Sequence, residues 1–167
     1  MRFYFAYLKH YVLANSRHGT HSPFVYKLAD EAIYAKQNSC AADFTFADLV
    51  PPAYRKVLKP ILLSLGYTAL VGLDKEISES SLVARYVEAK EVQELESVVS
   101  PLKAAAVVVG GIYESPEARL QWKALQAHAD VTVAIDLFFF GLLFKRAGQH
   151  KENFRLRYPA GFIARKP

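Results

Sequence analysis

Two stretches in the second half of the chain decide the fold class: AAVVVGG at residues 105–111 and VTVAIDLFFFGLLF at residues 131–144. The first is a continuous apolar run that ends at two glycines, which is typical of a strand buried on both faces of a sheet. The second begins with an alternating segment, residues 131–137, and continues as GLLFK at residues 141–145 after a turn near Phe140 and Gly141. This pattern predicts an antiparallel pair of strands.

Shorter apolar runs extend this pattern toward both ends of the chain. Residues 67–71 and 84–88 predict two further strands, and residues 154–158 alternate as an edge strand does. Five helices are predicted between the strands or ahead of them, over residues 3–14, 23–36, 52–65, 90–99 and 116–129. Strands separated by helices favour an α/β fold with a reduced, mostly parallel sheet, and the C-terminal hairpin adds antiparallel strands.

Local signals fix where three of these helices begin or break. Ser22 and Ser115 are N-cap residues followed by prolines that fit the first helical turn. Pro60 lies inside the third helix, and we expect it to kink or interrupt that helix.

Length and composition are those of one globular domain. The chain has 167 residues, of which 52% are hydrophobic and 22% are charged. Within this domain we distinguish a helical part over residues 1–65, an α/β core over 66–158 and a tail over 159–167. One cysteine, Cys40, excludes an internal disulfide framework and a multi-cysteine zinc cluster. No apolar run reaches the roughly 18 residues of a membrane span, and we expect a cytoplasmic protein.

The first predicted helix carries an aromatic face that something must cover. The residues that share this face at helical spacing are Tyr4, Tyr7, Leu8, Tyr11 and Val12. The rest of the domain, a second subunit or a membrane surface are the candidates. We favour the domain itself or a second subunit, because the segment is short and has few cations.

Positive charge is concentrated near the C-terminus. The net charge is +5, and residues 145–167 hold seven basic residues against one acid, Glu152. A solvated surface of mixed charge is the simplest interpretation. A nucleic-acid interface is a weaker hypothesis, in which the contacts are Phe154, Arg155, Arg157 and Tyr158.

Isolated polar residues give few indications of chemistry. His18 and His21 lack a nearby acidic partner, so we predict no metal site and expect their loop to have a structural role. Asp74 is expected to be a surface acid. Asp136 lies among apolar residues and, if buried, needs a partner such as Arg155 or Arg157.

Phe138, Phe139 and Phe140 are three successive aromatic residues beside the predicted turn. Side chains alternate along a strand, so all three cannot face one core. They predict an interface with a second copy or a protein partner; the alternative is an aromatic cover within the domain.

Three stretches carry a resemblance to a known family. The first is Tyr7-Leu8-Lys9 followed by HGTHSPF at residues 18–24. The second is Gly111-Ile112-Tyr113 leading into a helix with Trp122. The third is the hairpin at residues 131–144 followed by QHKENFRLRY at residues 149–158. Together they resemble bacterial class I S-adenosylmethionine-dependent methyltransferase-like proteins, whose N-terminal signature is similar to HGxHSPF.

This resemblance implies a Rossmann-like three-layer sandwich with a cofactor site at the carboxyl ends of its strands. The corresponding cofactor-binding positions are Gly72, Asp74, Glu88 and Gly110. The resemblance also implies that His18, His21 and Ser22 line the substrate entrance. Family members are longer, and the residues that this chain lacks fall between 66 and 105. Only Gly72 remains of the family's glycine-rich turn.

The matching ends and the degenerate middle favour a non-catalytic methyltransferase-like protein with a binding or scaffold role and no cofactor. One alternative is a small active methyltransferase that holds S-adenosylmethionine in an altered pocket. A second alternative is nucleic-acid binding through the basic C-terminal strand.

Overall fold

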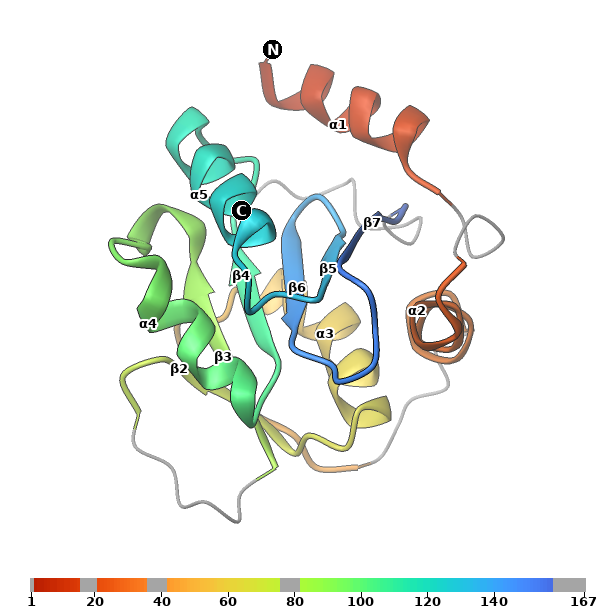
Figure 1. Cartoon of the computed structure of the whole chain (residues 1–167), viewed down its shortest axis with the longest axis vertical. Helices are drawn as coiled ribbons and strands as arrows, with labels where there is room; N and C mark the ends of the chain where they lie inside the picture. The colour runs from red at the N-terminus through yellow and green to blue at the C-terminus, as the bar shows by residue number, and fades with distance from the viewer. Residues whose placement is uncertain (1, 16–20, 36–41, 76–81, 158–167) are drawn as a thin grey trace.

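The computed structural model of the chain describes residues 2–15, 21–35, 42–75 and 82–157. These residues form an α/β fold around one seven-stranded sheet, with helices on both of its faces (Figure 1). The strands are β1 (Thr45–Phe46), β2 (Ala69–Gly72), β3 (Val83–Glu88), β4 (Val107–Gly110), β5 (Val133–Asp136), β6 (Phe140–Phe144) and β7 (Glu152–Arg155). The α-helices are α1 (Arg2–Leu13), α2 (Pro23–Leu28), α3 (Pro52–Ser64), α4 (Leu95–Val99) and α5 (Pro116–Ala127).

The strands lie in the order β1-β2-β3-β4-β6-β5-β7. Strands β1 to β4 are parallel neighbours, β6 runs antiparallel to β4 and β5, and β7 pairs parallel with β5 at the edge. The predicted mixed sheet and C-terminal hairpin are therefore confirmed. The two-residue strand β1 was not predicted, although Phe44, Thr45 and Phe46 alternate in polarity.

Each face of the sheet has its own core, because successive side chains on a strand point in opposite directions. Val108 packs on the face that carries α2 and α3, whereas Val107 and Val109 pack on the face that carries α4 and α5. The β1–β2 connection thus runs on one face and the β3–β4 connection on the other. Both crossover connections lead to the next strand in the same direction across the sheet, but on opposite faces. The two crossovers therefore have opposite handedness.

The helix starts predicted at Ser22 and Ser115 are confirmed, whereas the helix predicted over 90–99 starts later. The hydroxyl oxygens of Ser22 and Ser115 accept hydrogen bonds from the backbone N–H of Val25 and Ala118. Helix α3 runs through Pro60 without interruption. The predicted helix over 90–99 is instead α4 between two short 3₁₀ turns, because Val92 and Glu94 have extended backbones.

Helix α1 packs on the domain through a face that shares Tyr7 with the predicted face but leaves most of the predicted face exposed. Phe3, Tyr7 and His10 contact the ring of Phe138, whereas Tyr4, Leu8 and Val12 remain 62%, 60% and 68% exposed. The aromatic contacts with Phe138 and the polar contact of His10 determine which face of α1 is turned toward the domain. The described part of the chain leaves the apolar side chains of the opposite face uncovered.

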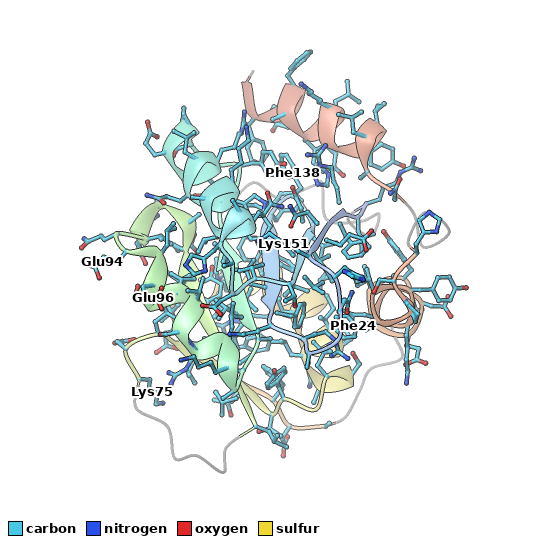
Figure 2. All side chains as sticks on the ribbon, viewed as in Figure 1. Phe24, Lys75, Glu94, Glu96, Phe138 and Lys151 are labelled. Atoms are coloured by element: carbon cyan, nitrogen blue, oxygen red, sulfur yellow. The ribbon has the colours of Figure 1, made fainter. Side chains whose placement is uncertain are left out.

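Phe138, Phe139 and Phe140 are all buried, which corrects the prediction that they form an exposed interface. The backbone of Phe138 has φ +71°, which breaks the strand alternation and allows three adjacent rings to enter the core. Figure 2 shows Phe138 in the region between α1 and the sheet. The cover is thus the chain's own first helix.

None of the helices in the described part of the chain combines the length and the apolar character needed to cross a membrane.

Candidate functional site

The predicted cofactor positions lie at the carboxyl ends of neighbouring strands. Glu88 at the end of β3 is paired in register with Gly110 at the end of β4, and Gly72 ends β2 next to Tyr86. The structure therefore brings Glu88 and Gly110 together, as the resemblance implied. Asp74 lies beyond β2 and is exposed, as expected for a surface acid.

The chain's own side chains occupy the space above these glycines. A Cβ atom at Gly110 would overlap the Tyr86 hydroxyl and lie 2.8 Å from Oε1 of Glu88. At Gly111, a Cβ would lie 2.7 Å from Oε2 of Glu88, and at Gly72 it would lie 2.5 Å from Oδ1 of Asp74. A cofactor needs this space for close approach to the backbone. The residues present therefore do not fit S-adenosylmethionine.

Electrostatics at this edge also disfavour a ribose contact. The Tyr86 hydroxyl, on a residue that is 1% exposed, donates a hydrogen bond to Glu88. Burial raises the pKa of the Glu88 carboxyl, the hydrogen bond from Tyr86 lowers it, and the nearby Glu114 raises it further. One of the two carboxylate oxygens, Oε1, already accepts a hydrogen bond within the protein.

The residues predicted to line the substrate entrance lie elsewhere. His18 is outside the described residues, and His21 is exposed. Ser22 is buried and accepts a 2.8 Å hydrogen bond from Nε2 of Gln149. Both residues line a cavity of about 720 Å³ beside the loop between β6 and β7. That loop lies at the amino ends of the parallel strands, whereas Glu88 lies at a carboxyl end. The predicted substrate entrance and the predicted cofactor positions are therefore separate.

A buried carboxylate lies at the carboxyl end of β5. Asp136 is 2% exposed, and its Oδ1 is 2.8 Å from Nε2 of His10 and 2.9 Å from the Phe138 amide nitrogen, which donates to it. The hydroxyl of Tyr113 donates to Oδ2 over 2.7 Å. Nε of Arg155 is 3.8 Å from the same oxygen. Burial of Asp136 and its pairing with Arg155 agree with the sequence, whereas His10 and Tyr113 were missed.

This network also changes the acidity of its tyrosine. Burial raises the pKa of the Tyr113 phenol, and the adjacent Asp136 carboxylate raises it further. The phenol therefore keeps its proton and acts as a hydrogen-bond donor. His10 could have been found from the spacing of Phe3, Tyr7 and His10, which marks a second helical face.

A cavity of about 880 Å³ opens next to this network, between α1 and the start of α5. Its charged and aromatic lining comes from segments far apart in the sequence. The charged and aromatic lining residues are Phe3, Phe5, Lys9, Tyr113, Glu114, Arg119, Lys123 and Arg155. Basic side chains therefore outnumber the one acid in its wall.

The basic C-terminal strand is largely engaged within the domain. Phe154 is buried, and Arg155 lies beside Asp136. Arg157 donates from Nε to the Ala14 carbonyl over 3.1 Å and lies over the ring of Tyr11. Tyr158 is outside the described residues. These contacts argue against this strand as a free surface for stacking nucleic-acid bases.

Comparison of the chain with protein-family models, curated protein sequences and solved structures gives no match. The resemblance to methyltransferases therefore stays a prediction.

We predict that Asp136→Ala lowers the free energy of unfolding by about 3–5 kcal/mol, because it leaves buried polar partners without an acceptor. Chemical denaturation measures this change. The control is Asp130→Ala, which removes an exposed ion pair with Lys145 and should cost far less. Equal losses in the two variants would contradict the central role of Asp136.

We predict that Glu88→Gln raises the melting temperature at pH 7. The folded-state pKa of Glu88 lies above the ordinary value of 4.5, so the folded state binds its proton more tightly than the unfolded state does. The contribution of Glu88 to the free energy of unfolding therefore falls as pH rises from the ordinary pKa of glutamate through the raised pKa of the folded state. The amide still accepts from Tyr86 and has no charge to desolvate.

The gain in melting temperature of Glu88→Gln over the wild type should shrink as pH falls below the ordinary pKa of glutamate. Thermal unfolding at a series of pH values tests this trend. A variant that is less stable than the wild type at pH 7 would show that the ionised carboxylate stabilises the fold.

Proposed function

We propose that this chain is a non-catalytic binding protein on a Rossmann-like, methyltransferase-like fold. One observation carries the proposal: Tyr86 and Glu88 occupy the space against Gly110 and Gly111 where the cofactor of such a fold would approach the backbone. Parallel strands with helices on both faces, followed by an antiparallel hairpin, support the choice of fold.

The order of the strands differs from the reversing order of a Rossmann sheet, and it supports the loss of a cofactor crevice rather than the choice of fold. Open α/β sheets bind ligands at the point where the strand order reverses. Across the described strands, β1 to β4 follow one another without a reversal. The parallel part of the sheet thus lacks the arrangement that usually creates a nucleotide crevice.

An active methyltransferase would require a different arrangement at this edge. The Tyr86 ring would have to leave a fully buried position, and Glu88 would have to exchange its tyrosine partner for ribose hydroxyls. Both changes cost packing and hydrogen bonds. The binding role falls instead on the open cavity between α1 and α5, not on the buried aromatic hairpin.

Thermal unfolding with and without S-adenosylhomocysteine tests the proposal. We predict a shift below about 1 °C at millimolar ligand. A ligand present at 100 times its Kd stabilises by about 2.7 kcal/mol, which corresponds to roughly 5–10 °C for a domain of this size. A known class I methyltransferase in the same assay is the positive control.

A shift of several degrees that is lost in Glu88→Gln would overturn the proposal. That result would mean that Tyr86 and Glu88 move aside to admit the cofactor. The active-methyltransferase alternative would then replace it.

A further inference from the structure

The cavity between α1 and α5 concentrates positive charge from three elements. Lys9 comes from α1, Arg119 and Lys123 lie one turn apart on α5, and Arg155 ends β7. The acid in the cavity wall is Glu114. Asp136 lies behind the wall, where His10, Tyr113 and Arg155 already surround it.

Several of these cations lack a partner within the described part of the chain. Lys9 and Lys123 are exposed and form neither a hydrogen bond nor an ion pair with a described residue. Nε of Arg119 is buried without an acceptor. A buried donor without a partner costs free energy, and neighbouring like charges repel. An anion in the cavity would offset the repulsion between the cations.

Arg119 is held in place by the network around Asp136. Its guanidinium carbon is 5.1 Å from the centroid of the Tyr113 ring, and the Tyr113 hydroxyl donates to Asp136. The contact therefore positions the cation at the cavity wall in the absence of a ligand. Such preorganisation lowers the entropic cost of binding.

Aromatic side chains form another part of the cavity wall. Phe3, Phe5 and the Tyr113 ring line the same cavity. Its volume of about 880 Å³ lies in the range of roughly 300–1,000 Å³ that is typical of small-molecule sites. A ligand that fits must carry both a charged group and an apolar body.

We propose that this cavity binds an organic oxyanion, that is, a phosphate or carboxylate group attached to an aromatic or aliphatic body. Arg119, Lys123 and Lys9 contact the oxyanion, and Phe3 and Phe5 contact the apolar body. The first turn of α5, which Ser115 caps, adds a favourable dipole. This ligand class deepens the proposed binding function, but it does not depend on the loss of the cofactor site.

Calorimetric titration of the full chain with phenyl phosphate and benzoate tests the proposal, with benzyl alcohol as the neutral probe. We expect saturable binding of the anions and none of benzyl alcohol. Lys123→Gln should weaken binding about tenfold, because it removes one charge-assisted contact. The control is Lys103→Gln, which removes the same charge outside the cavity and should leave the affinity unchanged at equal ionic strength.

A lipid headgroup carries the same chemistry, and a second experiment distinguishes this source. Vesicles of phosphatidylcholine with phosphatidic acid are compared with vesicles of phosphatidylcholine alone in a flotation assay. Binding to the anionic vesicles that is lost in Lys123→Gln, without binding of the soluble probes, would identify a headgroup. The exposed side chains of Leu8 and Val12 would then contact the acyl region.

The proposal is overturned if neither the soluble anions nor the anionic vesicles bind. It is also overturned if Lys123→Gln has no effect, or if Lys103→Gln weakens binding equally, since binding would then follow net charge alone. Titration with S-adenosylhomocysteine is scored separately. A positive result there contradicts the proposed non-catalytic function and leaves the anion site standing.

Discussion

The buried carboxylate of Asp136 is the constraint on which the functional end of the molecule depends. A carboxylate in an apolar core is stable only when hydrogen bonds and charges replace its water. Here His10, Tyr113 and the Phe138 amide replace it, with Arg155 nearby. His10 and Asp136 are 126 residues apart, so this contact fixes α1 against the C-terminal hairpin. The contact between His10 and Asp136 thereby sets which face of α1 is turned toward the domain. In this position α1 covers Phe138 and forms one wall of the cavity.

Two places at the carboxyl edge of the sheet differ in a way that bears on function. Above Gly110 and Gly111 the chain's own Tyr86 and Glu88 are packed against the backbone. Between α1 and α5 the space is open and its wall is basic. The resemblance to methyltransferases directs attention to the first place. The physical chemistry of the side chains favours the second as the place where a ligand binds.

Sequence patterns predicted the elements whose signals are local. The apolar run at β4, the alternation in β5 and the caps at Ser22 and Ser115 each depend on a few neighbouring residues, and the structure confirms them. The sequence also indicated that Asp136 is buried and that Arg155 lies near it.

The features that sequence reasoning missed depend on contacts between distant segments. The packed face of α1 is chosen by His10 reaching Asp136, which outweighs the larger apolar face of the same helix. Phe138 to Phe140 enter the core together because of one positive φ angle, which no periodicity indicates. Tyr86 and Glu88 are two apart on one strand and so share a face, but only the structure shows that this face covers Gly110.

Hydrogen–deuterium exchange of the α1 amides measures whether the contact of His10 with Asp136 holds α1 on the sheet. Amides in the second half of α1 should exchange as slowly in the wild type as those of the strands beneath it. Asp136→Asn should accelerate exchange in α1 while the β2–β4 part of the sheet stays protected. Rapid exchange throughout α1 in the wild type would show instead that Asp136 does not hold α1 in place, and that α1 neither covers Phe138 nor forms a wall of the cavity.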